Sequence, residues 1–118
     1  MDLEIYKAQV QENVIDLMLD MLGDGEDCDF SREDIDTCEA LLTDYLTTLA
    51  GMESPTDEAI MACVKQVVFA LNQLNEETDY ALIETMEREA IWEIIQNSAI
   101  ECGLTDPSDD ITEEWREW

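Results

Sequence analysis

The hydrophobic residues of this chain recur at intervals of three and four, the spacing that places side chains on one face of an α-helix. Four stretches show the pattern, and we expect each to form a helix with one buried face. Their apolar positions are, in chain order, Leu3, Tyr6, Val10, Val14, Leu17 and Met21; Ile35, Cys38, Leu42, Tyr45 and Leu49; Ile60, Cys63, Val64, Val67, Val68, Leu71 and Leu74; and Met86, Ala90, Ile91, Ile94, Ile95, Ala99 and Cys102. The third set is the widest, which predicts that the third helix is the most buried.

Residues that favour helix starts precede three of these stretches. Ser31 followed by Asp34 resembles a capping box, in which a hydroxyl and a carboxylate each bind a free backbone N–H group. Ser54 before Pro55 is a start signal of another kind, because the serine can cap while proline fits the first helical position. Thr85 is the expected cap of the fourth helix.

Glycine marks the expected ends. Gly23 and Gly25 stop the first helix, Gly51 the second, and Gly103 the fourth, where glycine readily adopts the left-handed conformation of a C-cap. The polar run 72–79 is expected to end the third helix.

Two segments fall outside the four stretches. In residues 80–84, Leu82 and Ile83 could belong either to an early turn of the fourth helix or to a short extended piece packed over the bundle, and we expect an interruption of the helical pattern there. In the last residues, Ile111, Trp115 and Trp118 stand at i, i+4 and i+7, which predicts one face of a short terminal helix.

These elements predict an all-α fold. Strand patterns of period two are absent from the sequence, and short connections favour antiparallel neighbouring helices. We therefore expect a single helical domain over 1–118, an up-and-down four-helix bundle-like domain with a short C-terminal helical segment. Residues 107–118 are interpreted as either a docked or a flexible tail.

The net charge of the chain limits the classes of partner that it can bind. The 118 residues include 31 Asp and Glu, five Lys and Arg and no His, a formal net charge of −26. Such a field steers positively charged partners and repels phosphates. Direct binding to nucleic acid or to an anionic membrane is therefore not expected, and a basic protein is the favoured partner.

The sequence also bears on location and cysteine chemistry. It has no basic leader and no run near the roughly 18 apolar residues that a membrane span requires, so we expect a cytoplasmic protein. Cys28, Cys38, Cys63 and Cys102 never form a C-x-x-C pair. Free buried thiols are favoured, with a disulfide framework as the alternative.

Catalytic chemistry is restricted by the lack of histidine, the commonest general base and metal ligand. Carboxylate pairs such as Glu84 and Glu87 have the spacing of Mg²⁺ sites, but the chain has no basic cluster to hold a phosphate. A calcium-binding EF-hand aligned on Asp20 fails at Ser31, where a bidentate glutamate is required. We expect no enzyme activity, cofactor or specific metal site, and keep a divalent-cation-dependent helical enzyme or cation-binding protein as the alternative.

Two groups of residues are the candidate partner-binding surface. One is an acidic loop, and the other is the acidic tail with its tryptophans, which could anchor an interface ringed by charge. Their members are Asp24, Glu26, Asp27, Asp29, Asp109, Asp110, Glu113, Glu114, Trp115 and Trp118.

The C-terminal third, with Glu113, Glu114, Trp115 and Arg116, resembles small bacterial proteins. In size and charge the chain is similar to phage-type DNA-mimic proteins and to bacterial immunity proteins, a likeness of composition without a shared motif. It implies a non-enzymatic module that binds a basic protein, either a toxin that it neutralises or a nucleic-acid-binding protein. The tryptophan pair favours the toxin neutraliser slightly. Both a monomer and a homodimer with an apolar interface are compatible with the sequence.

Overall fold

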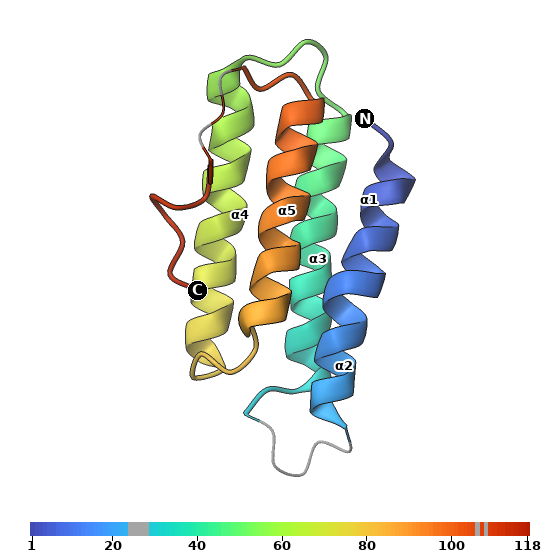
Figure 1. Ribbon diagram of the computed structural model, residues 1–118, viewed down its shortest axis with the longest axis vertical. Helices are drawn as coiled ribbons and strands as arrows, with labels where there is room; N and C mark the ends of the chain where they lie inside the picture. Colours follow the sequence, from blue (N-terminus) through green and yellow to red (C-terminus); the bar gives the residue numbers. More distant parts are fainter. Residues whose placement is uncertain (24–28, 106, 108) are drawn as a thin grey trace.

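A computed structural model describes residues 1–118 except 24–28, 106 and 108. Its elements are α1 (Leu3–Val10), the π-helical segment η1 (Gln11–Ile15), α2 (Asp16–Leu22), α3 (Arg32–Ala50), α4 (Asp57–Glu77) and α5 (Thr85–Glu101). The first three follow one another without a break and form one long rod, which runs antiparallel to α3 (Figure 1). The next two connections reverse the chain again, so the all-α, up-and-down four-helix prediction is confirmed.

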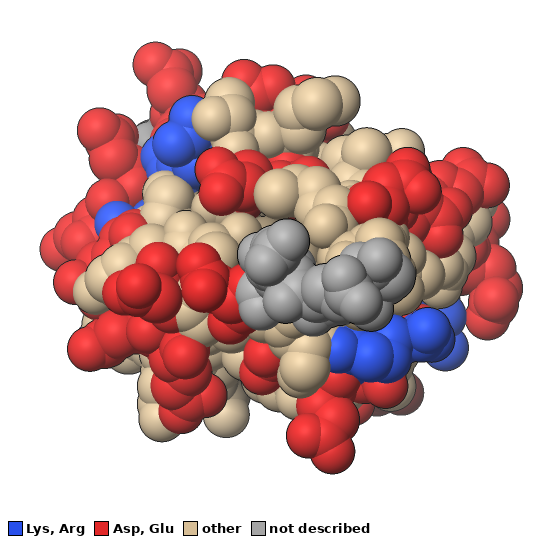
Figure 2. Space-filling model, turned by 90° about the horizontal axis from the view of Figure 1, so that it is seen from below, with Lys and Arg blue, Asp and Glu red and all other residues tan. Residues whose placement is uncertain are grey.

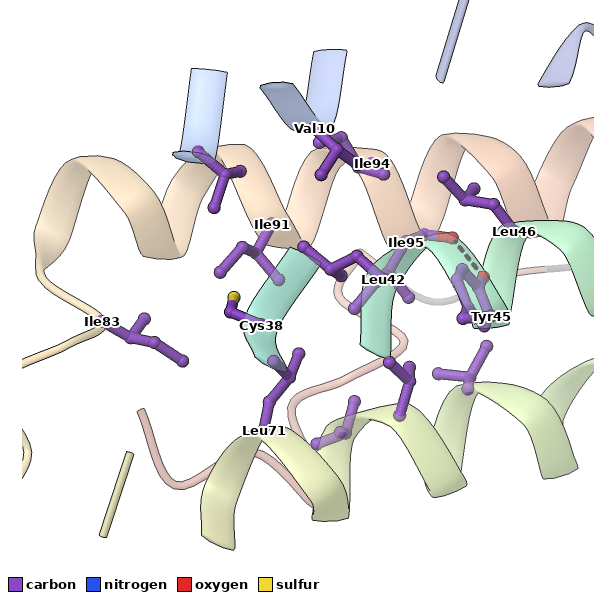
Figure 3. Close-up of a cluster of buried hydrophobic side chains, with 14 of the residues drawn as sticks. Val10, Cys38, Leu42, Tyr45, Leu46, Leu71, Ile83, Ile91, Ile94 and Ile95 are labelled. Carbon is purple, nitrogen blue, oxygen red and sulfur yellow. Dashed lines mark hydrogen bonds between the residues drawn. The ribbon is translucent and has the colours of Figure 1, made fainter. Parts of the chain in front are cut away.

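The core lies where the helices face one another. The first rod and α4 lie on opposite sides of the bundle, and each packs against both α3 and α5. Side chains from α3, α4 and α5 meet in the interior, where the Tyr45 hydroxyl donates a hydrogen bond of 2.9 Å to the carbonyl oxygen of Ile95 (Figure 3). The predicted apolar faces of the second and third helices are buried here, except that Cys63 is only partly covered.

The first helix departs from the expected pattern after Val14. Leu17 is only partly buried and Met21 is 48% exposed, whereas the neighbouring Ile15 and Met18 lie in the core. The reason is η1, since a π-turn adds one residue to the helical turn and rotates everything after it. The prediction of Leu17 and Met21 as core residues was therefore wrong.

The helix starts agree with the sequence in one case of three. The Ser31 and Asp34 capping box is present, with each side chain accepting from the other residue's backbone N–H. The start of α4, however, is capped by Thr56, whose hydroxyl oxygen accepts from the N–H of Ala59 at 3.1 Å. Ser54 lies outside the helix with a φ of +44°, so the Ser54 and Pro55 start was wrong by two residues.

The fourth helix starts one residue earlier than expected. Glu84, not Thr85, is the N-cap, and the buried Glu87 carboxylate accepts from the Glu84 N–H at 3.1 Å. Met86 is 65% exposed, whereas the next residue, Glu87, is buried, so the inner side of the first turn of α5 carries Glu87 and Met86 faces outward. This corrects the predicted burial of Met86. At the far end, Gly103 has the expected left-handed φ of +114°.

The C-terminal segment is a run of turns with one helical turn in it. The N–H groups of Trp115 and Arg116 both donate to the carbonyl oxygen of Thr112. Beyond that turn the chain is irregular, so the predicted helical spacing does not continue to Trp118. Residues 80–84 interrupt the pattern between α4 and α5 as expected.

Candidate functional site

Most of the acidic side chains in the described part of the chain face solvent, and few are neutralised. Only two ion pairs occur there, Arg32 with Asp36 at 3.1 Å and Arg116 with Asp110 at 2.7 Å. Lys65 lies over aromatic rings, with its nitrogen 5.5 Å from the ring centre of Phe69. The cations therefore leave nearly the whole negative charge of the surface uncompensated.

The body that bears this charge is elongated. It measures 47 × 28 × 19 Å. Dividing the length of 47 Å by the formal net charge of −26 gives one negative charge per about 1.8 Å. Duplex DNA carries one per about 1.7 Å of its axis and is of comparable width. The mean linear charge density of the protein is therefore close to that of DNA.

The first predicted group is described only at Asp29, which is exposed at the end of the bundle between α2 and α3. Asp24, Glu26 and Asp27 lie outside the described residues. The α4–α5 connection, with exposed Asp79, reaches the same end (Figure 1). Seen from this end, acidic side chains occur all around the surface (Figure 2). The carboxylates are thus distributed around the end rather than on one face of it.

A residue that the sequence analysis did not select projects from this end. Tyr80 is 57% exposed, and both it and Asp79 have positive φ values, of 62° and 57°. Left-handed backbone at two successive non-glycine residues is uncommon and costs free energy. An aromatic residue within a polar connection is the one sequence signal that could have identified it.

The second predicted group, the tail, is held along α4 and α5 by two side-chain amides. Asn72 donates to the carbonyl oxygen of Trp115 at 2.8 Å and accepts from the N–H of Glu117 at 2.9 Å. Gln96 donates to the carbonyl oxygen of Asp109 and accepts from the N–H of Ile111. Both amides bind main-chain atoms of the tail, as a protein surface binds the backbone of a separate peptide.

The side chains of the tail divide into two kinds. Asp109, Glu113 and Glu114 are exposed, as a partner-binding role would require. Asp110 instead accepts hydrogen bonds from Thr112 and Arg116. Its carboxylate is therefore already engaged within the protein.

The two tail tryptophans do not project freely into solvent. Trp115 and Trp118 are partly buried and pack against the hydrophobic core. Lys65 lies 5.9 Å from the ring centre of Trp115, and the Arg116 guanidinium lies 5.3 Å from that of Trp118. The hollow beside them, of about 580 Å³, is lined by Arg88, Glu89, Trp92, Asp110, Glu113, Arg116 and Trp118.

The described thiols are free and weakly acidic. Burial raises the pKa of Cys38 to about 12, and burial also raises the pKa of Cys63 and of Cys102. Thiolates are the reactive form of cysteine, so the raised pKa values make these three thiols less reactive than a free cysteine near neutral pH. Cys28 lies outside the described residues.

Neither a metal-binding cluster nor a membrane-spanning helix occurs among the residues that the structure describes. In that part of the chain, no three Asp, Glu or Cys side chains converge as metal ligands. None of its helices is both long enough and apolar enough to cross a bilayer. The pKa of Asp57 is lowered because the Thr105 hydroxyl and N–H donate hydrogen bonds to its carboxylate.

Comparison with known proteins gives no relative for this arrangement. The chain matches no family model, no curated protein and no solved structure. Its function has to be inferred from its own residues and their geometry.

Proposed function

We propose that this protein is a non-enzymatic acidic module that binds a basic protein partner by presenting the charge of duplex DNA. The observation that supports this most directly is the match in linear charge density, one negative charge per about 1.8 Å over a body 47 Å long. A groove shaped and charged to hold DNA would attract such a rod strongly. We expect the encounter to occur in the cytoplasm, with a nucleic-acid-binding protein.

The placement of the tryptophans is why mimicry is preferred to toxin neutralisation. A neutraliser of the kind expected from the sequence would use Trp115 and Trp118 as an exposed apolar anchor. Both pack against the core, and each is covered by a cation at 5.9 Å or less from its ring centre. The energetic gain from burying them has already been taken up within the protein.

One observation nevertheless favours neutralisation as a second candidate. Tyr80 is 57% exposed on strained backbone at the acidic end of the bundle, and tyrosine is enriched at the centres of interfaces. In that mode Tyr80 is the anchor, and the carboxylates around it supply steering. The substitution Tyr80→Ala separates the two candidates, because it should abolish tight binding to a toxin and leave binding by a DNA-shaped field nearly unchanged.

The test is capture from a lysate of the source cell with the chain immobilised, followed by elution with either salt or duplex DNA. A DNA mimic should capture a basic protein that both treatments release, because the two polyanions compete for one groove. Release by salt but not by DNA would contradict mimicry and favour neutralisation. Recovery of only metabolites or metal ions, or tight stoichiometric binding of Mg²⁺ or Ca²⁺ in a titration, would contradict both.

A matched pair of variants locates the surface used. Glu76→Gln, Glu77→Gln and Asp79→Asn together remove three exposed charges near the loop end of α4. Glu53→Gln and Glu58→Gln remove exposed charges at the opposite end of the same helix. If the partner recognises the charge of the whole rod as it would DNA, both variants should weaken binding in proportion to the charge removed. If the partner contacts Tyr80 and the carboxylates around it, only the first variant should weaken binding.

A further inference from the structure

One surface of this acidic protein is almost free of acids. Residues 59–75 contain no Asp or Glu, and residues 40–52 contain only Asp44. At the average frequency of the chain, 31 acids in 118 residues, these thirty positions would hold about eight. They form the C-terminal half of α3 and most of α4, two helices that pack against each other in the bundle.

The exposed positions of this surface are neutral with one pair of exceptions. Asp44 on α3 and Lys65 on α4 are both exposed, and their charges cancel. The other exposed side chains of the two helices here are Ala40, Thr47, Thr48, Ala50, Ala62, Gln66, Phe69 and Gln73. We call this surface the neutral face. The formal charge of its α3 and α4 residues is zero on a molecule whose formal net charge is −26, and the acidic tail borders the face where Trp115 lies against Lys65.

The neutral face contains both a hollow and a projecting ring. A groove of about 190 Å³ lies between α3 and α4, and apolar and polar side chains line it together: Leu41, Asp44, Tyr45, Thr48, Cys63, Gln66, Val67 and Ala70. Phe69, which precedes Ala70 on α4, is outside the lining and is 47% exposed. An exposed phenylalanine near a partly apolar groove suits a self-complementary interface.

We propose that the neutral face is where two copies of this chain associate about a two-fold axis. Two molecules of charge −26 repel each other wherever their acids meet, so close approach is favoured only through a face without acids. A basic partner would not be attracted to this face, because most carboxylates of the protein lie on its other surfaces. The second copy is therefore the occupant that the charge distribution selects.

The two-fold arrangement also brings the two charged residues of the neutral face, Asp44 and Lys65, together across the interface. Phe69 of each copy faces the groove of the other, and Lys65 lies one helical turn before Phe69 on α4. Asp44 lines the groove itself. When Phe69 enters the second copy's groove, Lys65 approaches the second copy's Asp44, so that both charges of the neutral face are paired across the interface.

Salt separates this proposal from the binding of a basic partner. Raising the ionic strength from about 0.1 M to about 1 M shortens the Debye length from about 10 Å to about 3 Å. Repulsion between the two acidic bodies then weakens, while burial of the neutral face is unaffected, so dimerisation should strengthen. Attraction of a basic protein should weaken over the same range. Dimerisation and partner binding therefore respond to salt in opposite directions, and each can be contradicted without contradicting the other.

The experiment is sedimentation equilibrium of the full chain at these two ionic strengths, with the wild type and two variants. The wild type should form more dimer at the higher one. Gln66→Glu, which places one extra acid per copy beside the groove, should weaken association by about tenfold or more. Asn97→Glu adds the same charge at an exposed position of α5 and should change it little. A monomer at both ionic strengths, or equal effects of the two substitutions, would overturn the proposal.

A charge exchange tests the pairing itself. Asp44→Lys and Lys65→Glu should each weaken the dimer, and the two together should restore it. Failure of the double variant to recover association, with thermal unfolding unchanged, would overturn the two-fold arrangement.

Discussion

The side-chain nitrogen of Asn72 donates a hydrogen bond of 2.8 Å to the carbonyl oxygen of Trp115, and this contact ties the last residues of the chain to the outside of α4. The oxygen of the same amide accepts from the N–H of Glu117 at 2.9 Å. One buried side chain thus supplies hydrogen-bond partners to two main-chain groups of a segment that lacks regular secondary structure. Because hydrogen bonds are directional and apolar contacts are not, Asn72 helps to fix where the tail lies along α4.

Substitution of Asn72 by alanine should therefore release the tail. Two hydrogen bonds are lost, at a cost of about 1 kcal/mol each in the free energy of unfolding. Denaturant unfolding measures the loss of stability, and hydrogen exchange at the Glu117 amide, which should become faster, measures the release. Gln73→Ala is the control, because this exposed neighbour makes only a 3.4 Å contact with Glu77. Unchanged exchange in Asn72→Ala would show that packing of the tryptophans holds the tail unaided.

Substitution of Tyr45 by phenylalanine tests the polar contact inside the core. The Tyr45 hydroxyl donates to the carbonyl oxygen of Ile95 and accepts from the Ser98 hydroxyl at 3.2 Å. Its loss should lower the free energy of unfolding by about 1 kcal/mol and no more, since the single Ser98 hydroxyl proton can then be donated to the Ile95 carbonyl oxygen, 3.0 Å away. Tyr80→Phe, at an exposed tyrosine, should have almost no effect. Equal effects of the two substitutions would contradict a stabilising role for the buried hydroxyl.

The same tyrosine predicts the behaviour at alkaline pH. Burial raises the pKa of Tyr45 in the folded state, and burial followed by the hydrogen bond to Glu101 raises the pKa of Tyr6. In the unfolded chain a tyrosine loses its proton near pH 10, so above that pH the unfolded state binds fewer protons than the folded one. The contribution of these two tyrosines to stability is therefore complete below about pH 10 and is lost as the pH rises further, whereas the raised pKa values of the three described cysteines begin to lower stability from about pH 8.5. Thermal melts against pH should show this fall, and Tyr45→Phe should make it shallower than in Tyr80→Phe.

The sequence predicted the four helices well but predicted their caps and some of their buried positions poorly. Periodic burial is a property of many residues at once, so four helices could be predicted even though Met86 proved to be exposed. A cap depends on one or two backbone angles. Ser54 and Thr56 are chemically equivalent candidates, and only the chain path, with Ser54 at a φ of +44°, selects between them.

The candidate surface was predictable in kind but not in arrangement. Net charge is fixed by composition, so an acidic surface follows from the sequence. The separation of Asp29 from Asp109 and the packing of Trp115 against the core follow from the direction of the tail, which depends on Asn72 and Gln96. Single amides of this kind have no periodic signal. The acid-free run 59–75 was visible in the sequence, but its meaning depends on its pairing with α3 in space.

The start of α4 offers a direct comparison of two hydroxyl residues. Thr56→Ala removes the side-chain acceptor for the Ala59 N–H and should lower the free energy of unfolding by about 1 kcal/mol. Ser54→Ala removes a hydroxyl of similar exposure that lies outside the helix and should change it by less than about 0.5 kcal/mol. Denaturant unfolding of the two variants is sufficient. A larger loss in Ser54→Ala would mean that the helix begins two residues earlier in solution.

The π-helical segment makes the sharpest prediction about packing, because a regular helix and the observed one place different residues in the core. Met18 is fully buried after η1, so Met18→Ala should cost about 2–5 kcal/mol of stability. Leu17 is only partly covered, and Leu17→Ala should cost about 1 kcal/mol or less. In an uninterrupted α-helix from Leu3 the order would be reversed, since Leu17 continues the spacing of Val10 and Val14. Unfolding free energies of the two variants therefore decide whether the extra residue in the turn is present in solution.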